Sequence, residues 1–319
     1  MPRNLSPAFC CNGGAMCRGF RGTELFEGNT ALRIHHNMYQ GHYLRYSIMR
    51  LLRKWNSGIG LETCILFAKE GANILMADIS GPALEKALSK LRQLVPSAHK
   101  VEIQVCSHHP LRRVASSRLT PQICDVAKEA NVAALVNHVD AWGGVDIMFN
   151  NAGIMHADDA DAIDTPEKIW DLTQAINVKG VWFGCKHAVI SMRKFNKRKG
   201  SIINTASVVA LVGSATPQLA YTASKGAVLA LTRELAIVHA REGIRFNALC
   251  PAPLNTPLLQ DWLGDDHPKR LRREIHFPTG RFGEAIEQAQ AVLFLASDES
   301  GFINGQVGGL RSQNTRDYG

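Results

Sequence analysis

Apolar residues recur along this chain in two alternating patterns. Short apolar runs bounded by small or polar residues predict buried strands at residues 73–77, 101–106, 145–149, 201–204 and 244–250. Longer stretches with apolar residues three or four positions apart predict helices at 61–70, 82–94 and 167–185, the last interrupted at 177–180. Two other predicted helices end near 142 and 297, and one begins near 221. Strands that alternate with helices form parallel sheets. The pattern therefore predicts an α/β fold, a doubly wound parallel sheet with helices on both faces in a three-layer sandwich.

The pattern is interrupted before residue 56. Residues 25–34 begin like a first strand, but residues 35–55 are basic and aromatic. A membrane-surface or partner helix is one interpretation of this second stretch; a chance amphipathic insertion is the other, and we favour the insertion. The apolar residues at helical spacing, which predict a basic amphipathic helix, are Leu44, Ile48, Leu51, Leu52 and Trp55.

The net charge of +8 would suit nucleic acid or an anionic membrane, but its distribution argues against both. Eleven basic residues lie in three segments without Asp or Glu, at 1–22, 31–56 and 107–123. Because those segments do not share the β-α pattern, the charge does not describe the surface of the domain. The chain contains no run of about 18 apolar residues, so the sequence predicts no membrane-spanning helix. We therefore expect no nucleic-acid partner and no stable membrane insertion.

The cysteines and the ends of the chain bound its organisation. We expect disorder over 1–22, one domain over 23–306 with insertions at 35–55 and 107–123, and an irregular tail over 307–319. The acid-free start would permit a mitochondrial transit peptide, but no amphipathic helix supports one. The eight cysteines lack paired spacing and predict reduced thiols of a cytoplasmic protein without a metal site: Cys10, Cys11, Cys17, Cys64, Cys106, Cys124, Cys185 and Cys250.

Three reactive side chains lie close together in the sequence after the 201–204 strand. Ser207 falls in a loop, and Tyr221 and Lys225 are four residues apart at the start of a predicted helix, so they share a face. A phenol has a pKa of about 10, and a neighbouring ammonium group lowers it toward neutrality. A surface Tyr and a solvated Lys at this spacing are the alternative.

A second group of residues follows the order of a dinucleotide-binding unit. Gly58 and Gly60 open a helix, a short strand follows, and that strand ends at Asp78. Helix amides face a pyrophosphate in such units, and a carboxylate about 20 residues on receives ribose hydroxyls.

Taken together, these motifs resemble those of one enzyme family. From Ser57 to Gln306 the chain is similar to the short-chain dehydrogenase/reductases, single-domain Rossmann enzymes that move hydride between NAD(P) and an alcohol or carbonyl. The motifs that carry the resemblance are Ser-Gly-Ile-Gly (57–60), Cys-Asp-Val (124–126), Asn-Asn-Ala-Gly (150–153), Asn-Val-Lys-Gly (177–180), Ser207, Tyr221-x-x-x-Lys225 and Cys-Pro-Ala-Pro-Leu-Asn-Thr-Pro (250–257).

The resemblance implies a role for each catalytic candidate. Tyr221 would be the general acid/base at the substrate oxygen, and Lys225 would lower its pKa and hold the nicotinamide ribose. Ser207 would hydrogen-bond the same oxygen, and Asn177 would support a proton-relay water. The substrate would be a secondary alcohol or ketone, for example a 3-oxoacyl, sugar or steroid-like compound.

The resemblance also implies the cofactor and the assembly. Asp78 would favour NAD over NADP, because a carboxylate repels a 2′-phosphate. By family analogy the protein would be a homodimer or homotetramer. Asp125 and Val126 would contact the adenine, and Leu254 and Thr256 the nicotinamide amide. The implied cofactor contacts are Ser57, Gly58, Ile59, Gly60, Asp78, Asp125, Val126, Asn150, Ala152, Gly153, Tyr221, Lys225, Pro251, Leu254 and Thr256.

Some positions depart from the family's pattern. Arg53 and Lys54 stand where the glycine loop has Thr and Gly, Ala252 replaces a usual Gly, residues 107–123 interrupt the match, and no convincing strand follows Gln306. These departures leave open a second function, a cofactor-impaired, non-catalytic protein of the same fold that acts as a binding partner. The abrupt segments at 31–56 and 107–123 suggest translated intron or frame-shifted sequence, and an abundant transcript encoding both would contradict that hypothesis.

Overall fold

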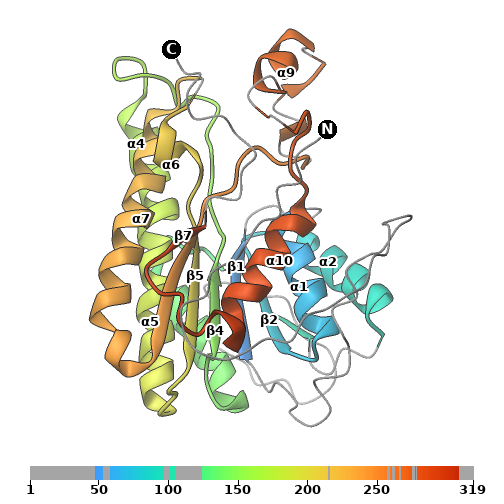
Figure 1. Ribbon diagram of the computed structural model, residues 1–319, viewed down its shortest axis with the longest axis vertical. Coiled ribbons are helices and arrows are strands. Elements are labelled where there is room, and N and C mark those ends of the chain that lie inside the picture. The colour runs from blue at the N-terminus through green and yellow to red at the C-terminus, as the bar shows by residue number, and fades with distance from the viewer. Residues whose placement is uncertain are drawn as a thin grey trace, which may run out of the picture. The chain divides into compact units, whose positions relative to one another are not determined.

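A single parallel sheet organises the computed structural model (Figure 1). The structure describes residues 47–52, 58–96, 101–104, 124–214, 216–256, 259–260, 263–265, 267–274, 277 and 279–308. Among these residues the strand order is β3-β2-β1-β4-β5-β6-β7, and every neighbouring pair is parallel. The strands are β1 Ser47–Leu52, β2 Asn73–Asp78, β3 Val101–Gln104, β4 Ile147–Asn150, β5 Gly200–Thr205, β6 Ile244–Leu249 and β7 Val307–Gly308.

The strand order reverses between β1 and β4. The chain winds outward from β1 to β3, then crosses back to β4 and winds the other way. The strands end together at one edge, since Leu52 pairs with Asp78, Leu51 with Asn150, and Thr205 with Leu249. Ligands of doubly wound folds bind outside this carboxyl edge, at the reversal point.

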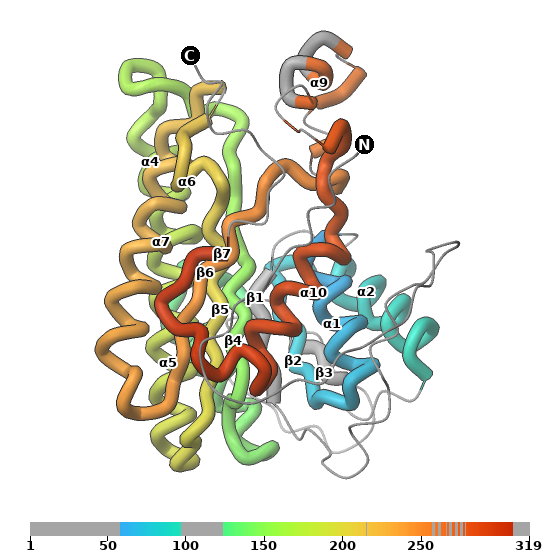
Figure 2. Tube along the Cα trace, in the orientation of Figure 1, coloured from blue at the N-terminus to red at the C-terminus, as the bar shows by residue number. Residues whose placement is uncertain are grey.

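Helices cover both faces of the sheet (Figures 1 and 2). On one face α1 (Ile59–Lys69), α2 (Gly81–Leu94) and α10 (Ala285–Ala296) pack in one apolar cluster, and on the other α3 (Glu129–His138), α5 (Gly180–Lys194) and α7 (Leu219–Val238) pack in a second. Successive residues of β2 alternate between the two clusters. This explains why the inner strands are apolar throughout. The cysteines that the structure describes are buried, namely Cys64, Cys124, Cys185 and Cys250.

The remaining helical elements connect the strands and the larger helices. The interruption expected at 177–180 is a π-helical turn, Ala175–Lys179, which joins α4 (Glu167–Gln174) to α5 without a break. Two further helices are α6 (Val209–Val212) and α9 (His267–Glu274), and 3₁₀ turns occupy Val139–Trp142, Ala240–Glu242 and Asp298–Ser300. Within the described ranges, none of the helices combines the length and the apolar character that crossing a bilayer requires.

Two expectations about the strands of the sheet are wrong. The helix expected around residues 44–55 is, over Ser47–Leu52, the strand β1 at the centre of the sheet. A short apolar run fits either element, and here pairing on both sides decides for the strand. A strand also follows Gln306, because Val307 and Gly308 pair with Ala248 and Leu249. The first strand expected at 25–34 lies outside the described residues.

Candidate active site

The first turns of α7 bring Tyr221 and Lys225 to the carboxyl edge of the sheet. The Lys225 side chain is buried, and its Nζ atom donates to the carbonyl oxygen of Thr205, at the end of β5, over 2.8 Å. The same Nζ atom lies 5.5 Å from the centroid of the Tyr221 ring. Within the described part of the chain the ammonium group makes this one hydrogen bond, so two of its three N–H donors remain for a ligand.

Ser207 reaches the same place from the loop after β5. Its buried hydroxyl is hydrogen-bonded to the Tyr221 side chain. The loop is fixed from β6, because the amide of Ala206 donates to Leu249 and that of Val208 to Pro251, over 2.8 and 3.0 Å. The three residues that the sequence singled out are therefore together in space.

Burial sets the protonation of this cluster. It raises the pKa of the Tyr221 phenol, and the hydrogen bond with Ser207 offsets only part of that shift. Burial also lowers the pKa of the Lys225 ammonium to about 8. The sequence predicted that Lys225 would lower the pKa of the phenol, but burial is the stronger effect and the net shift is upward.

Asn177 lies in the π-helical turn and is fully buried. Its Oδ1 atom accepts the amide of Ile154 over 2.8 Å, and its Nδ2 atom donates to the Ile154 carbonyl and to the Ser224 hydroxyl over 2.9 and 3.0 Å. Ser224 in turn donates to the Tyr221 carbonyl over 2.7 Å. Asn177 thus ties the loop after β4 to α7, and its support of a relay water stays a prediction.

Gly153 lies beside this group on the loop after β4. A Cβ atom placed on it would lie 3.3 Å from both Asn177 Oδ1 and Lys225 Nζ, so both side chains would have to shift slightly. The preceding Ala152 is buried. Glycine at 153 lets the backbone approach the cluster closely.

The glycine turn before α1 lies at the same edge. Gly58 is the residue before the helix, with φ at 137°, a value that side chains disfavour, and a Cβ atom there would meet nothing within 4 Å. Ile59 and Gly60 form the first turn of α1, whose N-terminus can face an anion. Three predicted features of this turn lie outside the described residues, namely Ser57 and the departures Arg53 and Lys54.

Asp78 ends β2 and is buried. Its Oδ1 atom accepts the amide of Ser80 over 2.8 Å, and its carbonyl oxygen accepts the amide of Cys124 over 3.0 Å. That second bond places Asp125 and Val126 next to the end of β2. The predicted adenine-binding residues therefore reach the expected edge in spite of the interruption before them.

Asn150 ends β4, and its side chain enters a buried polar network. Its Nδ2 atom donates to Asn204 Oδ1 over 2.8 Å, and Asn204 donates to the Thr232 hydroxyl of α7 over 3.0 Å. A Cβ atom on Gly184 of α5 would lie 2.0 Å from Asn150 Oδ1. Asn150 therefore joins β4, β5 and the helices, and its predicted contact with a cofactor stays a prediction.

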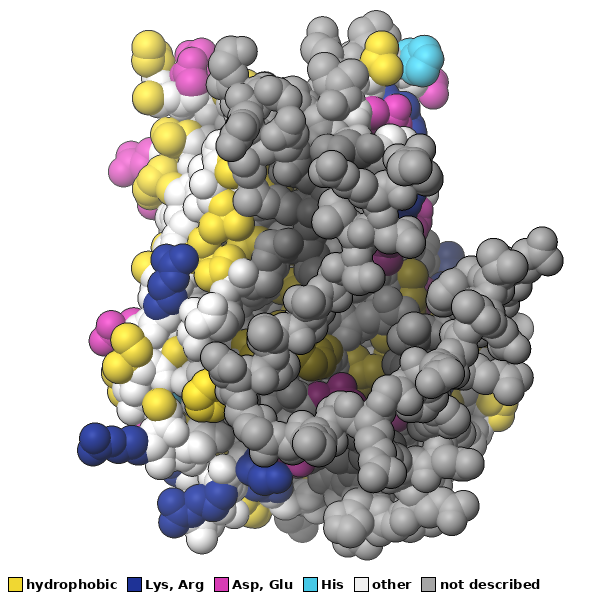
Figure 3. Space-filling model, viewed as in Figure 1, with side chains coloured by type: hydrophobic (Ala, Val, Ile, Leu, Met, Phe, Trp, Pro, Cys, Tyr) yellow, Lys and Arg dark blue, Asp and Glu magenta, His cyan; other side chains and the backbone are white. Residues whose placement is uncertain are grey.

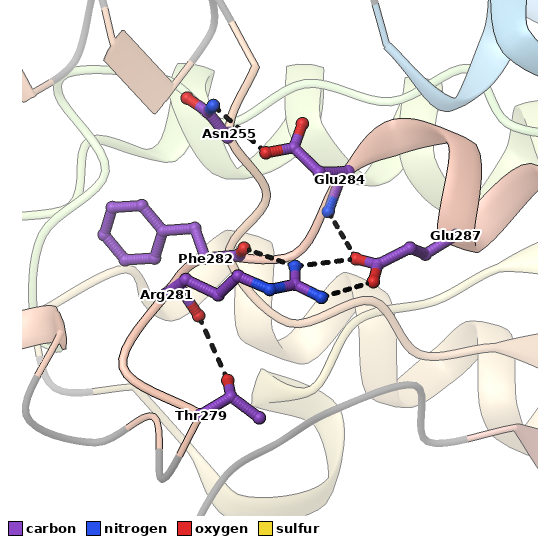
Figure 4. A network of polar contacts seen from close by, with 6 residues as sticks. All are labelled: Asn255, Thr279, Arg281, Phe282, Glu284 and Glu287. Atoms are coloured by element: carbon purple, nitrogen blue, oxygen red, sulfur yellow. Dashed lines mark hydrogen bonds and ion pairs between the residues drawn. The ribbon is translucent and has the colours of Figure 1, made fainter. Parts of the chain in front are cut away.

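The segment after β6 is held against the start of α10 (Figure 4). Leu254 forms a β-bridge with Gly283, the Asn255 side chain donates to Glu284 over 3.2 Å, and Thr256 follows, partly buried. Arg281 binds Glu287 through two hydrogen bonds, and Glu287 also accepts the amide of Glu284 over 2.7 Å. These contacts fix the segment that carries the predicted nicotinamide-binding residues Leu254 and Thr256.

Sequence reasoning did not identify Thr205 and Ser224. Thr205 contributes a main-chain carbonyl, which no residue pattern signals. Ser224 lies three residues after Tyr221 on the same helix, and that spacing was a usable signal.

The edge fits a dinucleotide in three respects. Open space lies above the strained turn at Gly58, a buried carboxylate ends β2 at Asp78, and the buried ammonium of Lys225 has donors to spare. All three lie along the carboxyl edge of the sheet.

Comparisons with known proteins agree with this geometry. A family model described as Enoyl-(Acyl carrier protein) reductase matches residues 109–308. The 3-oxoacyl-[acyl-carrier-protein] reductase FabG of Thermotoga maritima is 34% identical over 257 residues, which cover 80% of this chain and 92% of that protein. Levodione reductase of Leifsonia aquatica is 31% identical, over 81% of this chain and 90% of that protein.

Solved structures are similar as well. The crystal structure of levodione reductase gives a TM-score of 0.72 at 30% identity and covers 86% of this chain and 100% of its own. That of gox2181 gives 0.71 at 27% identity, over 83% and 94%. The chain therefore belongs to the short-chain dehydrogenase/reductases, NAD(P)-dependent oxidoreductases that act on alcohols and ketones.

Proposed function

We propose that this protein transfers a hydride between NAD and a secondary alcohol or ketone, with Tyr221 as the general acid/base. The observation that carries the proposal is the cluster at the carboxyl edge, where buried Lys225 lies beside the ring of Tyr221 and Ser207 is bonded to the Tyr221 side chain. Burying an amine destabilises the folded protein, so a buried lysine indicates a functional site. The Lys225 amine also keeps hydrogen-bond donors for a ligand.

In this proposal each side chain has a distinct task. A bound nicotinamide cofactor supplies or accepts the hydride. Ser207 donates to the substrate oxygen and holds it beside Tyr221, while Lys225 holds ribose hydroxyls with its two remaining donors. In ketone reduction Tyr221 donates its proton to the oxygen, and the raised pKa keeps it protonated at neutral pH. In alcohol oxidation the phenolate removes the hydroxyl proton, and Asn177 supports the relay that exchanges it with water.

The chemistry of Tyr221 is tested by Tyr221→Phe, which removes the phenol hydroxyl and keeps the ring. We expect kcat to fall about 1,000-fold or more, within the range that acid-base catalysis contributes together with positioning. NADH binding, followed by fluorescence, should be unchanged, and so should the thermal midpoint. Thr222→Ala, one residue further along α7, is the matched control and should keep its activity. Unchanged turnover in Tyr221→Phe would refute the mechanism.

We also propose NAD as the preferred cofactor, because the buried carboxylate of Asp78 would repel a 2′-phosphate. NADH should bind at least about 10-fold more tightly than NADPH, a difference of about 1.4 kcal/mol. Asp78→Asn keeps an acceptor for the Ser80 amide but removes the charge, so it should narrow that difference. Titration by cofactor fluorescence measures both, and tighter binding of NADPH by the unmodified protein would contradict the preference.

The surroundings of Ser207 favour substrates with an apolar body. The next residue, Val208, belongs to an apolar cluster with Ala252, Leu263, Phe277 and Phe282. Such walls suit acyl chains or ring systems better than sugars, whose hydroxyls would go unpaired. Within the alcohols and ketones, we therefore propose 3-oxoacyl or steroid-like compounds before sugars, and relative kcat/KM over a panel of the three tests this order.

A further inference from the structure

A buried carboxylate meets the start of the catalytic helix from outside that helix. Asp159 lies on the loop between β4 and α4 and is only 7% exposed. Its Oδ1 and Oδ2 atoms accept the main-chain amides of Ala220 and Tyr221 over 2.9 and 2.8 Å. These are the second and third residues of α7, whose own preceding residue, Gln218, provides no side-chain cap.

The same loop satisfies the neighbouring groups. The Ala160 carbonyl accepts the amide of Leu219, the first residue of α7, over 3.0 Å. Thr165 then supports the loop from behind, because its hydroxyl accepts the Ala160 amide over 3.0 Å and donates to Asp159 over 3.4 Å. The first three amides of α7, which no helical carbonyl can reach, therefore all bond to residues 159 and 160.

The loop that carries Asp159 is fixed at the active site as well. Asn177 holds both the amide and the carbonyl of Ile154, only five residues earlier. The short segment from Ile154 to Asp159 therefore connects the Asn177 side chain to the first turn of α7. Tyr221 is held at one end of this segment by Asp159, and Asn177 and Ser224 connect its carbonyl oxygen to the other end.

We propose that Asp159 is a positioning residue, which holds the first turn of α7 so that the Tyr221 phenol stays in contact with Ser207. The proposal rests on the function proposed above for Tyr221. Asp159 does not touch the reacting atoms, and it acts through the two main-chain amides. The negative charge of a carboxylate at a helix N-terminus also interacts favourably with the helix dipole. Both the hydrogen bonds and this interaction stabilise the first turn against fraying.

Fraying at this turn has a chemical consequence. Tyr221 is the third residue of α7, so loss of the two hydrogen bonds to Asp159 releases the residue that carries the phenol. A misplacement of about 1 Å can cost about 100-fold in rate. The Ser207 hydrogen bond lowers the pKa of Tyr221, so its loss would let that pKa rise further. A carboxylate that only stabilises the fold would change neither.

The test uses Asp159→Ala beside a matched control, Asp161→Ala. Asp161 lies in the same loop and also accepts two main-chain amides, those of Ile163 and Asp164, over 2.9 and 3.0 Å, but it is exposed and those amides are outside α7. Amide hydrogen exchange at Ala220 and Tyr221, followed by NMR, directly reports the two hydrogen bonds to Asp159. Steady-state kinetics and the pH profile of alcohol oxidation report its effect.

For Asp159→Ala we expect lost protection of both amides, a kcat at least about 10-fold lower, and a KM for NADH within about threefold of the original. The profile of oxidation should move to higher pH. Asp161→Ala should match the unmodified protein in all four. If Asp159→Ala does not fold, Asp159→Asn, which keeps one acceptor oxygen, decides by the same measurements.

Unchanged kcat and pH profile in a folded Asp159 variant would overturn the proposal, and so would amides that stay protected. Failure of the proposed function gives a different result, since Tyr221→Phe would then keep its activity. The exchange measurement needs no turnover, so it tests the hydrogen bonds between Asp159 and α7 in either case.

Discussion

Lys225 combines a charge and burial in a way that predicts how stability depends on pH. In the folded protein its pKa is about 8, against 10.5 for a solvated lysine, because burial disfavours the ammonium form. Between those two values the unfolded chain holds a proton that the folded chain has released. The free energy of unfolding then rises with pH across this window, since the unfolded state binds more protons.

Lys225→Met removes this contribution and leaves the rest of the fold in place. The unmodified protein should gain up to about 3 kcal/mol relative to the variant as the pH rises from 8 to 10.5, an upper value from about 1.4 kcal/mol per pKa unit. Urea unfolding of both proteins at several pH values measures the difference. Parallel stability curves across the window would show that the amine titrates at its solvated value.

At the scale of residues, the sequence indicated the candidate reactive side chains but not what holds them. Tyr221 and Lys225 are four apart, so their shared face follows from helical geometry, and the structure brings Ser207 to them. Asp159 is 62 residues from the Tyr221 amide that it accepts. No local pattern reveals such a partner, and the acidic loop around Asp159 resembles an ordinary solvated turn.

At the scale of elements, two predictions with clear boundary residues were confirmed. The helix expected over 82–94 is α2, Gly81–Leu94, and the strand expected over 244–250 is β6, Ile244–Leu249. Both have clear boundaries, a Ser cap before α2 and Gly243 in a left-handed conformation before β6. The six residues of β1 have no such boundary, and helical spacing there arose by chance.

The π-helical turn shows a different limit. Asn177 and Gly180 suggested a break between two helices, and the structure keeps the helix and widens one turn instead. An inserted residue in a helix leaves little trace in hydrophobic spacing. Such turns are frequent at functional sites, and this one directs Asn177 toward Ile154 and Ser224.

At the scale of the whole molecule, the helical layer of α4 and α5 exposes large apolar side chains, and Figure 3 shows hydrophobic side chains at the surface on the side of the molecule where α4 to α7 lie. Four of them are Trp170, Leu172, Trp182 and Ile190. Single exposed residues are ordinary, but several large apolar side chains exposed on one helical layer favour an interface. We therefore propose a homodimer or homotetramer.

Light scattering after size-exclusion chromatography should give a mass two or four times the 35.0 kDa of one chain. Trp182→Glu would place a charge in the interface and should shift the mass toward that of a monomer. A monomeric mass for the unmodified protein at micromolar concentration would contradict the proposal.

The layered sheet itself was predictable, because alternating strands and helices allow few arrangements. Its register was not, since the pairing of β1 with both β2 and β4 depends on segments far apart in the chain. The choice between residues 25–34 and 47–52 as the first strand required that pairing.

The central position of β1 also concerns time. Ile48 pairs with Ile147, so a growing chain completes β1 roughly a hundred residues before its second neighbour exists. At about 5–20 residues per second, a ribosome needs on the order of 5–20 seconds to close that gap. Throughout this interval one edge of β1 has unpaired main-chain N–H and C=O groups. A strand of another nascent chain can form hydrogen bonds with this edge. The yield of folded protein therefore depends on translation speed and on chaperones that shield this edge until β4 emerges.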